Sequence, residues 1–386
     1  MIAPAEGKST RQGQILTDQQ RLEWLRLWRS ENIGPATFRD LLNFAGSAAA
    51  ALEELPELSR KAGVLRPLRL CDESDAAREI DALAAAGGRF IGLGEPDYPP
   101  LLREIDGPPP LIAVRGNSEV FFTQSLAIIG SRNASVAGRK LATSFAHSLS
   151  EQNIIIVSGL ARGIDASAHT ASLEGGTIAV MAGGLDRIYP AENQTLADDI
   201  LDQGGLHVAE MPLGWQPRAQ DFPRRNRLVS GLSCAVLVIE AASRSGTLIT
   251  ARFAGEQGRD VFAIPNSPLD PRGAGTNRLL KQGAVLVTDP QEIVELLASQ
   301  DQLARTPPVT WQEPEFEQKP APPRSTDRQV VLDCLSVTPV HIDDILRFSG
   351  CHPAHVYQTL IELDLAGRLI RHADGQLSLG YSEELL

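Results

Sequence analysis

The side chains best suited to chemistry in this sequence are arginines grouped around one aromatic ring. Arg224, Arg225 and Arg227 follow Phe222 closely, and together they form the densest basic cluster of the chain. Arginine guanidinium groups bind phosphates, and an aromatic ring stacks on an unpaired base. This combination is more typical of single-strand binding than of duplex readout. The alternative is a solvated helix start with Phe222 in the core, and the sequence leaves stacking and packing of Phe222 equally open.

A second group of candidates lies in a loop between an apolar segment and a helix. Gly130, Ser131 and Arg132 follow the apolar residues 126–129, and a helix is expected from about residue 136. Glycine permits a tight turn, and backbone N–H groups at the start of a helix bind anions. Arg132 has no obvious packing role, so we expect it to contact a phosphate or a nucleic acid. The alternative is that Gly130 simply makes the turn.

Two more loops repeat this arrangement of glycine, hydroxyl and guanidinium groups. One follows the apolar segment 154–157, and the other opens a helix after Glu240. Both loops would present backbone N–H groups and hydroxyls to a phosphate. The candidates that they add to the DNA-binding set are Ser158, Gly159, Arg162, Arg244, Ser245, Gly246 and Thr247.

The second loop also holds an Asp–His pair, Asp165 and His169, that could serve as acid and base. No nucleophile with a clear role accompanies the pair. Capping of a helix by Asp165 and packing of His169 is therefore the favoured interpretation. The NAD fingerprint GxGxxG is absent, and Gly7-Lys8-Ser9 lacks the preceding strand that a P-loop needs. The sequence predicts no catalytic residue and no cofactor.

Short apolar segments alternate with helical stretches through the middle of the chain. The segments are rich in Ile and Val and lack strict alternation of polar and apolar residues, as expected of strands buried on both faces. This order predicts an α/β fold with a Rossmann-like, doubly wound parallel sheet, whose loops meet at the carboxyl edge of the strands. The expected strands are 126–129, 154–157, 177–181, 206–209, 235–239, 260–264 and 284–287.

Composition divides the chain into five parts. Residues 1–16 are a polar tail expected to be disordered, and residues 301–324 are a linker rich in Pro and Glu. The parts expected to fold are a helical domain over 17–86, the Rossmann-like domain over 87–300 and a winged helix over 325–386. The helical domain resembles a SAM or helix-hairpin-helix domain, because a turn at 32–35 separates two helices. That turn could contact a phosphate, but a plain helical hairpin is favoured.

The winged-helix pattern consists of three helices and a short hairpin. Its expected recognition helix, 352–366, contains no Arg or Lys, so it is a poor reader of duplex DNA. A protein-interaction module is the favoured interpretation. Cys351, His352 and His355 lie close in sequence, but a fourth ligand is not evident and we predict no metal site.

Bulk properties narrow the class of protein. The formal net charge of −12 argues against a protein that coats nucleic acid without specificity, although a basic groove can exist on an acidic protein. The four cysteines form no CxxC pair, which favours a reduced cytoplasm. No segment offers about 20 consecutive apolar residues, so neither a membrane span nor a membrane partner is expected.

Ordered motifs over residues 90–299 together resemble the DNA-processing protein A family, DprA, also called Smf. The matching segments are YPPLL at 98–102, GSRNAS at 130–135, SGLARGIDASAH at 158–169, GGLDRIYPAEN at 183–193, FPRRNRLVSGLS at 222–233, EAASRSGTLITA at 240–251 and GTNRLLKQGA at 275–284. The flanking helical and winged-helix patterns also fit the architecture of that family.

The resemblance implies a specific function. Members of the family bind single-stranded DNA, protect it from nucleases and load RecA recombinase onto it during natural transformation. They form a homodimer through the Rossmann-like domain. Phosphate contacts would fall on Arg132 and on the arginines of the FPRRNR motif, and a base contact would fall on Phe222. Asn226 and Glu240 match motif positions, and we expect scaffold roles for both.

Two other functions remain open at this point. One is a nucleotide-processing hydrolase of the lysine-decarboxylase-like Rossmann type, which relies on a PGGxGTxxE motif. The nearest segment here, SRSGTLITA at 243–251, lacks that glutamate. The other is a transcription regulator that reads duplex DNA with its winged helix, against which the lack of Arg and Lys in helix 352–366 argues.

Overall fold

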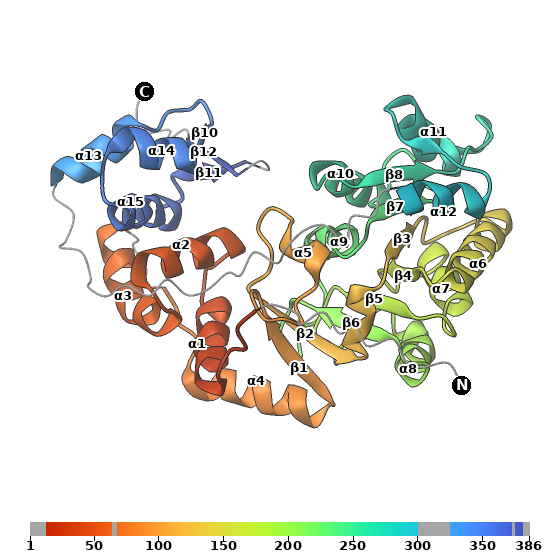
Figure 1. The fold of residues 1–386 in the computed structure, drawn as a ribbon, viewed down its shortest axis with the longest axis horizontal. Helices are drawn as coiled ribbons and strands as arrows, with labels where there is room; N and C mark the ends of the chain where they lie inside the picture. The colour runs from red at the N-terminus through yellow and green to blue at the C-terminus, as the bar shows by residue number, and fades with distance from the viewer. Residues whose placement is uncertain (1–12, 64–67, 300–324, 373–374, 381–386) are drawn as a thin grey trace, which may run out of the picture.

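The structure, a computed structural model, describes residues 13–63, 68–299, 325–372 and 375–380. Its centre is a nine-stranded sheet in the order β1-β2-β6-β5-β4-β3-β7-β8-β9 (Figure 1). The strands are β1 Gly88–Gly92, β2 Leu111–Gly116, β3 Ser125–Ile129, β4 Ile155–Ser158, β5 Thr177–Met181, β6 Leu206–Ala209, β7 Ala235–Val238, β8 Asp260–Ala263 and β9 Val285–Leu286.

The seven strands from β3 to β9 are those expected from the sequence, and each end agrees to within one residue. Neighbours among these seven pair in parallel, as β3 does with both β4 and β7. The sheet continues at one edge with two antiparallel strands, because β2 pairs antiparallel with β6 and with β1. The predicted α/β class and parallel core are therefore confirmed, with an antiparallel extension at one edge.

Helices cover both faces of this sheet. Leu126 and Ile128 of β3 pack into one cluster with Phe145, whereas Ala127 and Ile129 pack into another with Leu228. Successive residues of β3 thus enter opposite cores, which explains the absence of polar alternation in the sequence. The helices of this domain are α5 Pro100–Arg103, α6 Val136–Glu151, α7 Ile164–Ala171, α8 Gln194–Asp202, α9 Asp221–Gly231, α10 Thr247–Glu256, α11 Ala274–Lys281 and α12 Pro290–Ser299.

The helical domain lies beside β1 and β2 (Figure 1). It consists of α1 Asp18–Arg29, α2 Pro35–Ala45, α3 Ala48–Lys61 and α4 Glu73–Ala85. Leu16 is buried and its backbone N–H donates to Glu95, so the expected disordered tail does not extend as far as residue 16. Residues 1–12 lie outside the described residues. In the hairpin turn Ile33 is buried, which supports a structural role for the turn.

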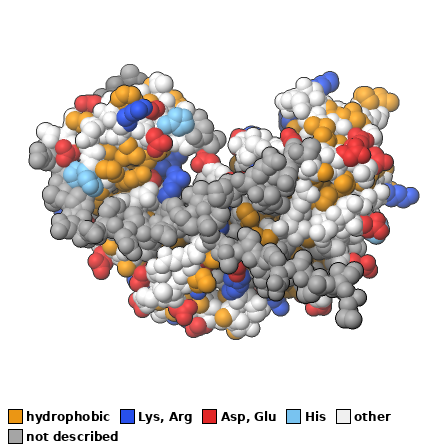
Figure 2. Space-filling view, in the orientation of Figure 1, with side chains coloured by type: hydrophobic (Ala, Val, Ile, Leu, Met, Phe, Trp, Pro, Cys, Tyr) orange, Lys and Arg blue, Asp and Glu red, His pale blue; other side chains and the backbone are white. Residues whose placement is uncertain are grey.

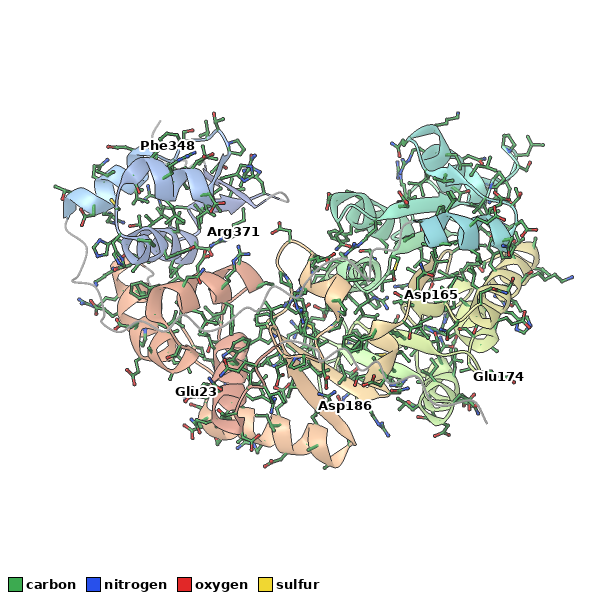
Figure 3. All side chains as sticks on the ribbon, viewed as in Figure 1. Glu23, Asp165, Glu174, Asp186, Phe348 and Arg371 are labelled. Atoms are coloured by element: carbon green, nitrogen blue, oxygen red, sulfur yellow. The ribbon has the colours of Figure 1, made fainter. Side chains whose placement is uncertain are left out.

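The winged helix packs on the helical domain. It consists of α13 Ser325–Asp333, α14 Ile342–Ser349, α15 Pro353–Leu365 and the strands β10 Val340–His341, β11 Leu369–Arg371 and β12 Gln376–Leu379. Helix α15, the expected recognition helix, lies against α2. Arg371 pairs with Asp40 of α2 at 2.7 Å and with Asp364 at 3.1 Å, and Thr37 donates to Asp364 (Figure 3). Helix α15 is therefore a protein-contact element within this chain, as its lack of basic residues suggests. Residues 301–324, the expected linker, lie outside the described residues.

In the space-filling view the surface is hollowed between the winged helix and the α/β domain (Figure 2). None of the helices in the described part of the chain has the length and apolar character needed to cross a bilayer.

Candidate functional site

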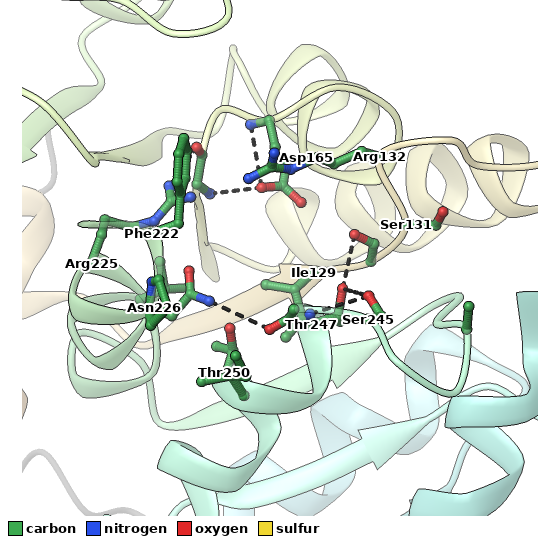
Figure 4. A pocket seen from close by; sticks show the side chains of 18 of the residues that line it. Ile129, Ser131, Arg132, Asp165, Phe222, Arg225, Asn226, Ser245, Thr247 and Thr250 are labelled. Carbon is green, nitrogen blue, oxygen red and sulfur yellow. Dashed lines mark hydrogen bonds between the residues drawn. The ribbon is translucent and has the colours of Figure 1, made fainter. Parts of the chain in front are cut away.

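A cavity of about 890 Å³ opens at the carboxyl ends of β3, β4 and β7. We call it the main pocket (Figure 4). The loops after β3, β4 and β7 line it together with helices α9 and α10, and the segments after β5 and β6 contribute Tyr189, Pro217 and Ala219. The lining residues are Ile129–Asn133, Gly159, Ala161, Asp165, Tyr189, Pro217, Ala219, Phe222, Pro223, Arg225, Asn226, Val229, Ala242–Thr247, Ile249 and Thr250. The carboxyl edge of an open parallel sheet is where ligands bind in α/β folds.

The first loop, between β3 and α6, is shaped by Glu240. The buried Glu240 carboxylate accepts from the Ser135 backbone N–H at 3.1 Å and from the Ser135 hydroxyl at 2.9 Å. The Ser131 N–H donates to the Glu240 carbonyl at 2.7 Å. A Cβ on Gly130 would come within 2.4 Å of the Ile164 side chain, so only glycine lets the loop approach α7 this closely. Glu240 thus has the scaffold role expected of it.

An exposed arginine and an aromatic ring meet at the mouth of the main pocket. The Arg132 guanidinium carbon lies 4.6 Å from the centroid of the Phe222 ring. The Tyr189 ring meets Phe222 edge-on, with centroids 5.4 Å apart. Phe222 is half-buried and Arg132 is exposed, and neither is in the core. The interpretation of Phe222 as a core side chain is therefore wrong.

The third loop, between β7 and α10, is held by its own hydroxyls. The Ser245 Oγ accepts from the Thr247 N–H and donates to the Thr247 hydroxyl. The Thr247 hydroxyl lies 3.1 Å from the Gly130 carbonyl, which joins the first and third loops. Asn226 reaches across the pocket to the Gly246 carbonyl at 3.5 Å (Figure 4). Helix α10 begins at Thr247, and its first N–H groups are bonded within the loop, to the Ser245 Oγ and to the carbonyls of Ser245 and Gly246.

Arg225 lies beneath the pocket and holds strand ends together. Its guanidinium donates to the carbonyls of Gly159 and Val180, at 2.5 and 2.6 Å. Burial lowers the pKa of Arg225 to about 10, and the nearby Asp165 opposes that shift. A Cβ on Gly159 would collide with this guanidinium. Arg225 and Gly159 line the pocket, but the position of Arg225 is a correction: its side chain is 6% exposed and supports the backbone.

Asp165 and His169 also act within the structure. The buried Asp165 carboxylate accepts from the N–H groups of Gly159 and Ala161. Burial raises its pKa, although Arg225 lowers it in turn. His169 is buried and its Nδ1 contacts the Thr177 hydroxyl at 2.7 Å. The packing of His169 is as expected, but capping of the helix by Asp165 is wrong: the N-cap residue of α7 is Gly163, and Asp165 binds the N–H groups of the preceding loop.

Three more residues expected to bind DNA are placed elsewhere. Ser158 is fully buried, and its hydroxyl donates to the Ile128 carbonyl at 2.6 Å. Arg224 and Arg227 both pair with the buried carboxylate of Glu210, at 3.2 and 2.5 Å. None of the three lines the main pocket. The contacts correct the expectation for Ser158 and Arg227, which are largely buried, whereas Arg224 is 43% exposed and its DNA contact stays a prediction.

The Glu210 contacts instead join α9 to the helical domain. Arg29 of α1 donates to the Glu210 carbonyl at 3.1 Å and pairs with Glu79. The Arg224 guanidinium lies over the Trp28 ring at 5.6 Å. Arg224 and Arg227 therefore face Glu210 from one side of α9, whereas Phe222 faces the main pocket from the other side.

The remaining predicted residues do gather. Gly130, Ser131, Arg132, Gly159, Phe222, Arg244, Ser245, Gly246 and Thr247 line the main pocket, and Arg162 lines an adjoining cavity. Sequence reasoning missed Asn133, Tyr189 and Thr250 as lining residues, and it gave Asn226 only a scaffold role. Asn133 sits directly after the GSR motif, and Asn226 and Thr250 lie within matched motifs, so membership of a motif was the available signal. Within the described residues, no group of three or more His, Cys, Asp or Glu side chains could hold a metal ion.

The fold and the pocket define a three-domain protein whose Rossmann-like domain gathers glycine-containing loops, hydroxyl-bearing residues and arginines at the carboxyl edge of its sheet. Comparison with known families names it more closely: the chain belongs to the DNA recombination-mediator protein A family, whose model matches residues 89–298. A DprA-like N-terminal HHH domain matches residues 18–82, and a DprA winged helix domain matches residues 315–375. The resemblance inferred from motifs is confirmed.

Relatives and solved structures agree with this placement. Protein Smf of Escherichia coli is 42% identical over 285 residues, which cover 73% of this chain and 75% of that protein. The DNA processing protein A of Streptococcus pneumoniae has a solved structure with a TM-score of 0.59 and 32% identity, covering 73% of this chain and 98% of that one. The structure of the Helicobacter pylori protein, which describes its single-stranded DNA binding mode, has a TM-score of 0.50 and 29% identity and covers 54% of this chain and 96% of that one.

Proposed function

We propose that the main pocket binds single-stranded DNA. The observation that carries the proposal is the exposed Arg132 guanidinium set 4.6 Å from the half-buried Phe222 ring at the pocket mouth. The guanidinium neutralises a phosphate, and the ring stacks on a base that is free of a partner strand. The H. pylori relative, described by its single-stranded DNA binding mode, supports this assignment.

We infer a path for the strand from this contact. Arg132 covers one face of the Phe222 ring, so a base stacks on the other face or on the exposed Tyr189 ring beside it. Phosphates lie against the Ser131 loop and the loop that precedes α10, whose arginines Arg132 and Arg244 and hydroxyl-bearing residues line the cavity. A duplex would bury its base faces in its own stack and could not use the ring.

The role is one of binding and delivery, without catalysis. Asp165, which lines the pocket, and Glu240, which shapes the first loop, each accept from backbone N–H groups, so they serve the fold and not proton transfer. The protein protects single strands entering the cell in natural transformation and loads RecA onto them in the cytoplasm. The family description as a recombination mediator supports this role. The hydrolase alternative predicts release of a base or phosphate from nucleotides, which a hydrolysis assay would detect.

The protein acts as a homodimer through the Rossmann-like domain. Strand β9 ends the sheet, and its Val285 and Leu286 are 39% and 52% exposed. An exposed apolar edge strand pairs readily with a second chain. The parent should sediment as a dimer and Leu286→Lys as a monomer, and a parent that sediments as a monomer at micromolar concentration would refute this assignment.

A salt titration of four proteins tests the DNA assignment. The proteins are the parent, Arg132→Ala, Phe222→Ala and the double variant, each binding single- and double-stranded oligonucleotides of equal length. Loss of the Arg132 phosphate contact should flatten the plot of log K against log salt by roughly 0.7. Loss of the Phe222 stack should cost about 1–3 kcal/mol with little change in slope. Thermal melts first establish that each variant is folded.

The contact between the two side chains adds a quantitative expectation. Because Arg132 lies on Phe222, removing the ring also frees the guanidinium. The binding free energies lost in the two single variants should therefore not add up to the loss in the double variant. Equal affinity of the parent for single strands and duplex would refute the function. So would an Arg132→Ala protein whose affinity and slope both match those of the parent.

A further inference from the structure

A second cavity, of about 520 Å³, adjoins the main pocket on the side of α6 and α7. We call it the flanking pocket. It shares Arg132, Tyr189 and Phe222 with the main pocket. The residues that line it alone include Arg139, Arg162 and Glu192. Both cavities lie within the range of about 300–1,000 Å³ that is usual for small-molecule sites.

The wall between the two cavities is made of a cation and two rings. Arg132 lies on the Phe222 ring, and Tyr189 meets that ring at an interplanar angle of 60°. A strand that passes from one cavity to the other must cross this wall. A base that stacks on the wall would then be followed by a phosphate in the flanking pocket, since bases and phosphates alternate along a strand.

Charge in the flanking pocket favours an anion. Three arginines line it, Arg132, Arg139 and Arg162, against one carboxylate, Glu192. Arg139 is exposed on α6, and in the part of the chain that the structure describes no ion pair involves it. Arg139 is therefore available to a phosphate without the loss of an internal contact.

Arg162 differs from Arg139 because Glu192 holds it. The two side chains pair at 2.7 Å and are 59% and 52% exposed. Exposed ion pairs contribute little to stability, so this one is readily exchanged for a pair with a phosphate. Until the exchange occurs, Glu192 keeps one cation occupied and places a negative charge where the phosphate would lie.

We propose that the flanking pocket binds the next nucleotide of the same strand, with Arg139 as a phosphate ligand and Glu192 as the residue that limits the affinity. The proposal rests on the proposed function, since it extends the path of the strand beyond the main pocket. A weakened second contact suits a protein that must give its strand up to another protein. Glu192 thus makes the bound strand easier to release.

The test uses the full chain and a series of oligothymidylates that grows by one nucleotide at a time. In the parent, affinity should rise by a step when the oligonucleotide becomes long enough to enter the flanking pocket. Arg139→Ala should remove that step, leave the shorter oligonucleotides unaffected and flatten the salt slope by roughly 0.7 for the longer ones. Glu192→Gln should tighten binding of the longer oligonucleotides severalfold and steepen their slope. Glu174→Gln, which lines neither pocket and is labelled in Figure 3, is the matched control and should behave as the parent does.

Two results would overturn the proposal. One is an Arg139→Ala protein that matches the parent at every length, and the other is a Glu192→Gln protein that binds no tighter than the Glu174→Gln control. If Arg132→Ala and Phe222→Ala weaken binding at all lengths in that same series, the main pocket stands and only the flanking pocket is refuted. A parent that binds no oligothymidylate refutes the proposed function itself.

Discussion

Replacing Arg225 by methionine should destabilise the protein, although the sequence places Arg225 among the DNA ligands. The guanidinium joins the carbonyls of Gly159 and Val180 at the ends of β4 and β5. It also offsets the buried charge of Asp165, whose pKa burial raises and Arg225 lowers. Methionine keeps an unbranched apolar stem, shorter than that of arginine, and donates no hydrogen bond.

The expected loss follows from what the substitution leaves behind. Two buried carbonyls lose their donor, at about 1–3 kcal/mol for each group left unpaired. Asp165 also loses a nearby cation that offsets its buried charge. The two carbonyls alone give a range of about 2–6 kcal/mol, and we expect about 3–5 kcal/mol. For a domain of this size, 1 kcal/mol lowers Tm by about 2–4 °C, which gives a decrease of roughly 6–20 °C.

The assay is thermal and urea unfolding of three proteins: the parent, Arg225→Met and Arg252→Met. Arg252 is an exposed arginine of α10 with an ion pair to Glu256, and its substitution should change stability by no more than about 0.5 kcal/mol. An Arg225→Met protein as stable as the parent that no longer binds single strands would refute the reasoning. That result would make Arg225 a DNA ligand.

Three further expectations concern the rest of the molecule. Burial lowers the pKa of His169 to about 3 and that of His207 to about 4. As the pH falls, the unfolded chain binds protons at these two histidines before the folded protein does. The free energy of unfolding should therefore be constant above about pH 6.5 and fall below it, by up to about 2.7 kcal/mol per pH unit for the two groups. A urea-midpoint profile that stays flat from pH 7 to 5 would contradict this. Asp40→Asn should weaken docking of the winged helix by removing the buried partner of Arg371, seen as larger dimensions in small-angle scattering with unchanged helix content. Deleting residues 301–386 should leave single-strand affinity within about twofold, because both pockets lie in the α/β domain; a large loss with the domain still folded would place the tail in the DNA site.

Local patterns were sufficient to predict most of the fold. The strands β3 to β9 are short runs of apolar residues between helical stretches. A strand that is buried on both faces is apolar along its whole length, so the sequence alone indicates its position. The pairing of β1 with β2 at the edge of the sheet was not predicted, because a pattern of apolar residues does not indicate which strands pair with each other. The contact of Leu16 with Glu95 joins residues 79 positions apart, and no local signal marks it.

The sequence by itself determined the loops that form the site. Gly130, Ser131 and Arg132 follow a strand directly, and in a parallel sheet the carboxyl ends of the strands share one edge. Ser245 and Thr247 reach that same edge for the same reason. A candidate that stands at the end of a predicted strand can therefore be placed without knowledge of the packing.

Only the tertiary structure decided which arginines of the FPRRNR motif face the pocket. On a helix with 3.6 residues per turn, successive side chains point about 100° apart, and the packing of α9 decides which side is covered. Phe222 faces the pocket, Arg225 points into the strand ends, and Arg224 and Arg227 meet Glu210. The groups that hold these arginines, a strand carbonyl and a carboxylate from other parts of the chain, are brought to them only when the sheet and the helical domain assemble. The sequence does not distinguish an arginine that is buried in the fold from one that binds a phosphate. The difference lies in the partner groups that the folded chain places around each side chain.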